Sequence, residues 1–266
     1  MSPHKEYVIL TNREVRDLAS KSRPTLQLFD EMVSWYGDSL TFSRQPEGES
    51  FVLPDIDEFG AVRLTLGVVV DGRAVAAIAH ECLHLQLLTK GNPMPVFQVF
   101  AGESDNDRIK RHICFTAHGE TGNWVGHATF IEQFRSMGFR DDEFLKSNAH
   151  ADPADLRRTL EKDRTNSILA GFERGRWNKH YLCELLLSRM GFDNCLSATF
   201  RHGQEMFATM GADALLIQRW FDSGNFRDPK KFATTMNVLL RAIGFGEAQY
   251  GCLDRYSGGF HLIEPP

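Results

Sequence analysis

Two histidines and a glutamate lie within five residues, at a spacing that suits a metal site on a helix. They are His80, Glu81 and His84, in the sequence His-Glu-Cys-Leu-His. Because side chains four residues apart lie on the same face of a helix, the two imidazoles can bind one metal ion. Glu81 directly follows the first histidine and can reach a water molecule on that ion. The motif therefore predicts a helical metal site with its own general base.

The residues around the motif favour a long helix. Apolar runs at 75–79 and 85–88 flank the motif on both sides. Turn-forming residues precede it at Asp71 and Gly72, and Gly91 follows it as a typical helix stop. We therefore predict a helix that begins near Asp71 or Gly72 and ends at Gly91.

Upstream of this helix the pattern predicts two helices and a small sheet. Thr11 and Glu14 have the spacing of a capping box, and apolar residues at helical spacing over 24–36 indicate a second helix. Residues 51–54 and 61–70 are rich in apolar and β-branched residues and are separated by a turn-like segment, which is typical of strands.

Downstream the chain is predicted to be mainly helical. Helical periodicity bounded by Gly, Asn, Asp and Pro predicts helices at 105–117, 121–137, 154–174, 177–190, 203–222 and 229–243. These elements predict an α+β fold in a single domain over 1–266. Its first part, 1–95, holds the small β-sheet and the motif helix, and its second part, 96–266, is α-helical.

The motif resembles that of the zincin metallopeptidases, in which both histidines bind zinc and the glutamate is the catalytic base. The resemblance covers the motif helix and, loosely, the sheet before it. It implies a zincin-like fold, a Zn²⁺ cofactor bound by His80 and His84, and Glu81 as the base. The metzincin subclass would require Gly at position 87 and His at position 90. The chain has Leu87 and Lys90 there, so that subclass is excluded.

Catalytic zinc sites usually have three protein ligands, so a third must come from a later segment. We predict that this ligand is His127, on the helix expected over 121–137. It shares one helix face with Trp124, Ile131 and Phe134 and should therefore point inward. The second part of the chain would then complete the metal site.

Three other residues remain open as the third ligand. Glu132 lies on the same helix as His127 but on another face, and a glutamate on a downstream helix is what the gluzincin branch implies. His118, in the loop-like segment 117–120, resembles the His-Gly element of SprT-like proteases. Glu205 resembles the glutamate of some gluzincin helices.

Supporting roles can be assigned only as alternatives. Asn123, one turn before His127, could hydrogen-bond a ligand imidazole, although an exposed position in a first turn is the simpler interpretation. Tyr181, Tyr250 and His202 could each stabilise an oxyanion. Their spacing does not select among them.

A three-ligand site of this kind predicts a zinc-dependent metallopeptidase acting on a peptide or protein substrate. Zinc lowers the pKa of a bound water to about 7, and Glu81 would take its proton and pass it to the leaving amine. Two alternatives stay open. The chain could be a catalytically inactive zincin-like binding or regulatory protein with a structural metal site, or a hydrolase of a non-peptide amide.

Composition narrows the class of partner and the compartment. The net charge is -5 and no dense Lys/Arg block occurs, so we expect no nucleic-acid partner. No signal peptide or apolar segment of membrane-spanning length is evident, so no membrane association is expected. The five cysteines are odd in number and dispersed, which predicts reduced thiols in a cytoplasmic protein. Cys82, inside the motif, should face the core on the side of the helix opposite the histidines.

Overall fold

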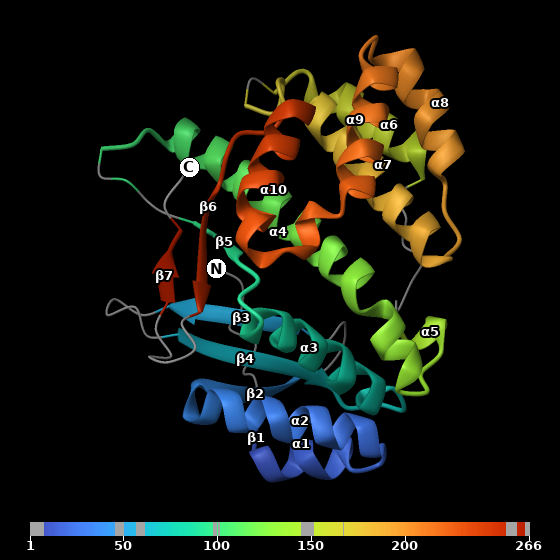
Figure 1. The fold of residues 1–266 in the computed structure, drawn as a ribbon. Helices are drawn as coiled ribbons and strands as arrows, with labels where there is room; N and C mark the ends of the chain where they lie inside the picture. The colour runs from blue at the N-terminus through green and yellow to red at the C-terminus, as the bar shows by residue number, and fades with distance from the viewer. Residues whose placement is uncertain are drawn as a thin grey trace. The chain divides into compact units, whose positions relative to one another are not determined.

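Regular structure begins at Val8 in the computed structural model, which describes residues 8–45, 51–56, 62–97, 100, 102–144, 152–166, 168–253 and 260–263. The chain has an α+β fold, as predicted (Figure 1). Its contacts divide it into two compact units. The first comprises 1–91, 130–147 and 253–261, and the second comprises 92–129, 148–252 and 262–266. The expectation of a single domain stays a prediction.

The first unit contains a four-stranded sheet in the order β1-β2-β4-β3. Strands β2 and β4 pair in parallel, and the other two pairings are antiparallel. Leu64, Leu66 and Val68 alternate along β4 and are fully buried, so one face of the sheet forms a core. The strands predicted at 51–54 and 61–70 are confirmed as the antiparallel pair β3 and β4. Strands β1 and β2 were not predicted. The strands are β1 (Val8–Leu10), β2 (Leu40–Gln45), β3 (Phe51–Ile56) and β4 (Val62–Val69).

Three helices of the first unit pack with this sheet: α1 (Asn12–Ala19), α2 (Arg23–Tyr36) and α3 (Ala74–Thr89). The predicted capping box is present, with the Glu14 amide donating to Thr11 Oγ1 over 3.2 Å and the Thr11 amide donating to Glu14 over 2.7 Å. Helix α3 carries the motif, as predicted, and packs against β3, β4 and α2. The Tyr36 hydroxyl donates to the Leu85 carbonyl over 2.9 Å and ties α2 to α3.

A single helix, α4 (Asp105–Ser136), replaces the two helices predicted at 105–117 and 121–137. Gly119 in the segment 117–120 suggests a break, but a glycine inside a helix costs only about 1 kcal/mol, which packing readily offsets. The prediction of a loop at 117–120 is therefore wrong. Because α4 is unbroken, it runs from the second unit into the first, where its last turns, from Phe130 to Ser136, lie.

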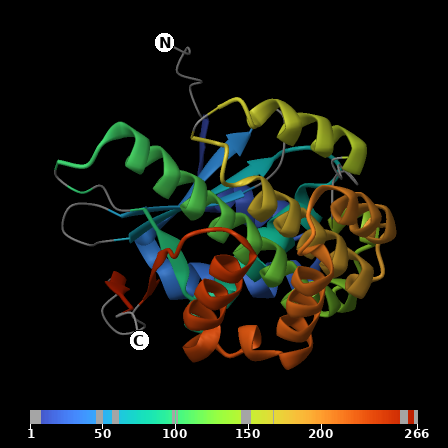
Figure 2. The same ribbon diagram turned by 90° about the horizontal axis from the view of Figure 1, so that it is seen from above.

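The short helix α5 (Asp141–Phe144) follows in the first unit, and the second unit is built from five further helices. Of these, α7 contacts each of the others (yellow to red in Figure 2). It is buried on nearly all sides, as expected of a helix whose apolar residues are not confined to one stripe. The helices are α6 (Pro153–Asp163), α7 (Glu173–Met190), α8 (Leu196–Met206), α9 (Met210–Ser223) and α10 (Pro229–Ile243).

Three of the predicted helices in the second unit have different boundaries. The helix predicted at 177–190 begins earlier, at Glu173. The helix predicted at 154–174 ends at Asp163, because Asn166 accepts hydrogen bonds from the amides of Ile168 and Leu169 in a turn. The helix predicted at 203–222 is divided into α8 and α9. The chain turns at Phe207, whose backbone is extended, and this brings Met210 back onto Gly203. The helix predicted at 229–243 is confirmed.

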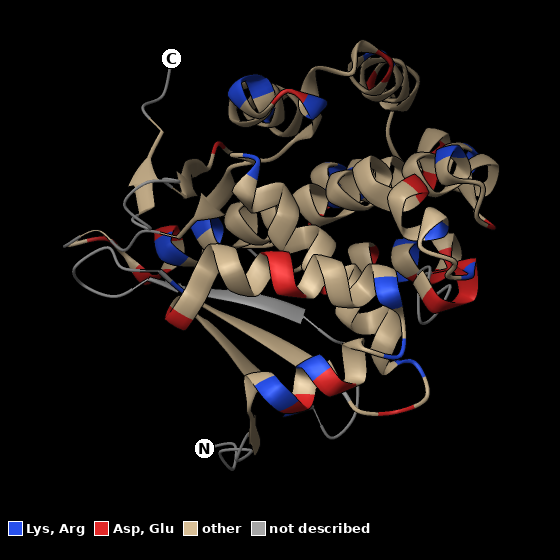
Figure 3. Cartoon of the chain, turned by 60° about the horizontal axis from the view of Figure 1, so that its bottom comes forward, with Lys and Arg blue, Asp and Glu red and all other residues tan. Residues whose placement is uncertain are grey.

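The remaining elements were not predicted. They are two short 3-10 helices, η1 (Gly37–Ser39) and η2 (Asn225–Arg227), and a three-stranded sheet in the order β5-β6-β7. Its strands are β5 (Met94–Val96), β6 (Gln249–Leu253) and β7 (Phe260–Leu262). Basic and acidic residues are interspersed along the helices (Figure 3). Within the described parts of the chain, no helix is both long and apolar enough to cross a membrane.

Candidate metal centre

Helix α3 brings the two motif histidines together on one face. The Nε2 atoms of His80 and His84 are 3.1 Å apart, and the ring centroids are 5.0 Å apart. Two nitrogens bound to one tetrahedral zinc ion would be about 3.4 Å apart, given Zn–N bonds of about 2.0 to 2.1 Å. The spacing of the two imidazoles therefore fits a shared ion.

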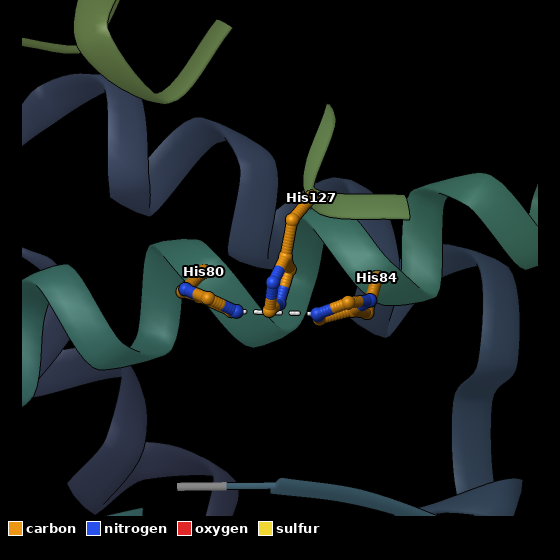
Figure 4. Close-up of side chains that lie close together, drawn as sticks. All are labelled: His80, His84 and His127. Carbon is orange, nitrogen blue, oxygen red and sulfur yellow. Dashed lines mark hydrogen bonds between the residues drawn. The ribbon is translucent and has the colours of Figure 1, made fainter. Parts of the chain in front are cut away.

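His127 of α4 joins this pair. It lies one turn before Phe130 on the same unbroken helix, and its ring points between the rings of His80 and His84 (Figure 4). One nitrogen from each of the three residues lies within 4.8 Å of the others, so the group could hold a metal ion. Among the described residues no other group of His, Cys, Asp and Glu has this geometry. The structure thus places the predicted third ligand beside the motif.

Aromatic rings enclose the three histidines. The Phe130 ring lies edge-on to His84, with centroids 4.8 Å apart, and the Phe144 ring lies 4.8 Å from that of His80. Trp124 lies 5.5 Å from His127 on the same helix. These ring contacts limit the rotation of the imidazoles, although His80 and His84 are only half-buried.

The electrostatics of this enclosure favour neutral imidazoles. Burial lowers the pKa of His80 to about 4. A hydrogen bond to the backbone of Phe144 raises this pKa but does not outweigh the effect of burial. Burial and the neighbouring His80 hold the pKa of His84 well below its usual range. Both rings are therefore uncharged at neutral pH and keep a nitrogen lone pair for a metal.

Glu81 is the only charged residue between Ala74 and Thr89 and is 7% exposed. Its carboxylate is not part of the three-histidine group. A residue next to the ligands that does not itself belong to the ligand group suits a general base. Cys82 is fully buried, as predicted, and burial holds the pKa of its thiol well above the usual range.

The other three candidate ligands lie elsewhere. The Glu132 side chain is 80% exposed and pairs with Arg135. His118 is fully buried in α4, where its nitrogens contact the Tyr250 hydroxyl and the Gly246 carbonyl. Glu205 is half-exposed and pairs with Arg157 at 2.6 Å. None of the three belongs to the group that could hold a metal.

The residues suggested as oxyanion donors have partners within the second unit. The Tyr181 hydroxyl accepts from Gln218 Nε2 over 2.9 Å, and the Tyr250 hydroxyl contacts His118 at 2.7 Å. His202 lies 3.5 Å from Glu205. Asn123 is exposed, as its simpler interpretation predicted. The described contacts thus assign none of these residues to the metal centre.

Phe144 and the helix α5 that carries it were not predicted as part of the centre. Four residues are too few for helical periodicity to be read from a sequence. The acidic run 141–143 after Gly138 does indicate a helix start, but it says nothing of contact with His80. Only the packing of α5 against α3 shows this contact.

Comparisons of the chain with family models, with curated proteins and with solved structures found no match.

Proposed function

We propose that the chain is a zinc-dependent metallopeptidase with a zincin-like arrangement of its site. The observation that carries the proposal is the group of His80, His84 and His127 nitrogens, which lie within 4.8 Å of one another, with Glu81 next to His80 in the sequence. Strand β4 directly before the motif helix, and a third ligand from a later helix, agree with such an arrangement. Three histidines also suit zinc, which prefers nitrogen and sulfur ligands in a tetrahedron with one open position.

Zinc held by these residues would supply a Lewis acid and a water molecule of pKa about 7. The chain itself contributes three tasks. The neutral imidazoles would hold the ion, and the rings of Phe130 and Phe144 pack against those of His84 and His80 and limit their movement. The Glu81 carboxylate takes a proton from the attacking water and delivers it to the nitrogen of the leaving amine.

The test separates metal binding from hydrolysis. Purified wild type should contain about one zinc ion per chain by mass spectrometry of the metal and should cleave members of an unbiased peptide library. Glu81→Gln should keep the zinc and lose cleavage, whereas His127→Ala should lose both. His118→Gln serves as the control, because His118 is a buried histidine outside the group.

Any of three results would overturn the proposal. The first is a Glu81→Gln variant that cleaves as fast as wild type, because that variant has no base. The second is a His127→Ala variant that holds zinc as tightly as the His118→Gln control. Wild type with no zinc and no cleavage would also contradict it.

A second candidate function is a structural metal site in a binding or regulatory protein. The burial of His127 and its contact with the Trp124 ring favour it, because a peptide substrate has little access to a buried ion. In that case wild type would hold zinc and lose stability on chelation, but it would cleave no peptide in the library. The same experiment therefore distinguishes the two functions.

The compartment and partners follow from the same proposal. All five cysteines are free, which supports a reducing, cytoplasmic setting. A peptide or protein substrate is the partner that peptidase chemistry requires. The interspersed charges of Figure 3 support the expectation that no nucleic acid is bound.

A further inference from the structure

Helices α9 and α10 of the second unit pack together and present apolar side chains to solvent (Figure 1). Three large side chains on this helix pair are exposed: Leu215 at 47%, Leu216 at 39% and Val238 at 64%. Exposed apolar residues that gather on one surface often mark a site of interaction with another molecule.

A hydrogen bond between the helices shows that Leu216 and Val238 lie close to the line where α9 and α10 meet. Trp220 Nε1 donates to the Thr235 carbonyl over 3.1 Å, so these two residues face each other. The connection between the helices, 224–228, has the length of a helical hairpin, in which the two helices are antiparallel. One turn back from Trp220 is Leu216, and nearly one turn on from Thr235 is Val238. The two exposed side chains therefore lie along the same seam.

Basic residues border this seam. Arg219 lies on the exposed side of α9, and Lys230 and Arg241 lie on the exposed side of α10, about two turns before and one turn after Val238. Arg241 pairs with Glu247 at 2.9 Å. No described residue forms a hydrogen bond or ion pair with the side chain of Arg219 or Lys230. Two cations beside the seam are thus available to a partner.

The charge of the hairpin differs in sign from that of the chain. Residues 210–243 contain five basic and three acidic residues, a net charge of +2, whereas the whole chain carries -5. One of the acidic residues, Asp213, is buried and pairs with Arg174. The exposed surface of the hairpin is therefore basic, and an acidic partner complements it.

This charge and the aromatic packing distinguish between possible occupants. A second copy of the chain would bring two basic hairpins together, which like-charge repulsion disfavours. Membrane surfaces are commonly bound through exposed aromatic rings, but Trp220 stacks on Phe226 with centroids 5.0 Å apart and its indole N–H is bonded to Thr235. An apolar seam between two helices instead suits the apolar face of a third helix.

We propose that the α9–α10 hairpin binds an acidic amphipathic helix of another protein. Apolar side chains of that helix would lie on Leu216 and Val238, and its carboxylates would pair with Arg219 and Lys230. The inference uses no residue of the proposed metal centre, so the two can fail separately.

The experiment selects a ligand for this surface from phage-displayed helical peptides of random sequence. Selection uses the full-length wild-type chain, with the double variant Leu216→Glu/Val238→Glu as the target for counter-selection. Both positions are exposed and glutamate is a good helix former, so the variant should fold; circular dichroism checks this. Selected peptides are then synthesised, and their Kd values are measured by fluorescence anisotropy at low and high salt.

The selected peptides should carry leucine or isoleucine at helical spacing with flanking aspartate or glutamate. They should bind Leu216→Glu at least about tenfold more weakly than wild type, and bind wild type more weakly as salt rises. Arg219→Gln should weaken binding and reduce its salt dependence. Ile109→Glu is the matched control, because it changes an exposed apolar residue on α4, outside the hairpin, and should bind as wild type does.

Several results would overturn the proposal. They are selection of no peptide that prefers wild type over the double variant, selection of basic or uncharged peptides, and equal binding by wild type and Arg219→Gln. Because Arg219 is exposed, its variant decides the matter even if the double variant does not fold. Dimerisation of wild type but not of Leu216→Glu in sedimentation would show that a second copy is the occupant. Binding to phosphatidylserine vesicles that Leu216→Glu abolishes would show that a membrane is.

Discussion

Replacing His118 tests whether the buried histidine of α4 is a structural element rather than a metal ligand. His118 is fully buried, and its Nε2–H donates to the Gly246 carbonyl over 2.9 Å. That leaves the Nδ1 lone pair to accept from the Tyr250 hydroxyl, 2.7 Å away. Both nitrogens are satisfied in the neutral ring, and a proton added at Nδ1 would turn the Tyr250 hydroxyl from donor to acceptor and leave a charge in a buried site.

The pKa of His118 sets how strongly the stability of the protein depends on pH. Burial lowers the pKa of His118 to about 4 from an ordinary value of 6.5, although hydrogen bonding to Gly246 and the charge of Glu247 act in the opposite direction. Because the folded pKa is depressed, the unfolded chain takes up the proton first as the pH falls. The stability contribution is thus fully present above pH 6.5 and is lost down to about pH 4. Between pH 7.5 and pH 5 the loss is about 2 kcal/mol.

The assay is urea unfolding of wild type and His118→Gln at pH 7.5 and pH 5. Other histidines titrate in both proteins, so the quantity of interest is the difference between their two pH dependences. Wild type should lose about 2 kcal/mol more than the variant on acidification. Tyr250→Phe should be less stable at pH 7.5 by about 1 to 3 kcal/mol, because Nδ1 loses its partner, but should keep the wild-type pH dependence.

Two results would refute this reasoning. Equal pH dependence in wild type and His118→Gln would show that the buried imidazole does not titrate as its surroundings require. Loss of zinc from His118→Gln, with His127→Ala still loaded, would show that His118 is a ligand after all.

Three further changes should have measurable effects. Asp213→Asn should lower the free energy of unfolding, measured by urea denaturation, by about 3 kcal/mol. The reason is that Asp213 is buried and pairs with Arg174 through two hydrogen bonds. Gly203→Ala should cost about 1 to 3 kcal/mol, because the added Cβ would clash with Nε1 of the fully buried Trp177 and lie 2.7 Å from Met210 Sδ; equal stability would contradict the packing. If the site binds zinc as proposed, a chelator should lower the melting temperature of wild type but not of His127→Ala. The stabilisation that wild type loses is about 2.7 kcal/mol when free zinc was a hundred times its Kd.

The part of the site that the sequence predicts well depends on helical periodicity. The four-residue spacing of His80 and His84 needs only a regular helix to bring their rings together. The inward face of His127 follows from Trp124, Ile131 and Phe134 at helical spacing around it. These inferences stay correct even though the boundaries of the predicted helix are wrong, because a longer helix keeps the same faces.

What the sequence does not predict depends on contacts between distant segments. Strand β2 pairs with β4 in parallel, and no local signal specifies that pairing. The ion pair between Arg135 and Asp141 requires a turn at Gly138, whose φ of 92° suits glycine. Gly119 shows the converse, because its sequence context indicates a break whereas the helix α4 continues through it.

The close approach of His80 and His84 has a consequence for the protein without a bound metal. Two Nε2 atoms 3.1 Å apart need a proton between them, because two facing lone pairs repel. One ring must therefore carry its proton on Nε2, and the other must offer its Nε2 lone pair. A zinc ion at the proposed site would need both Nε2 atoms as acceptors, so the donating ring would have to move its proton to Nδ1. NMR of chelator-treated protein should therefore show opposite tautomers for the two rings, and addition of zinc should make them alike without net proton release from this pair. Identical tautomers before zinc is added would contradict the hydrogen bond between the two rings.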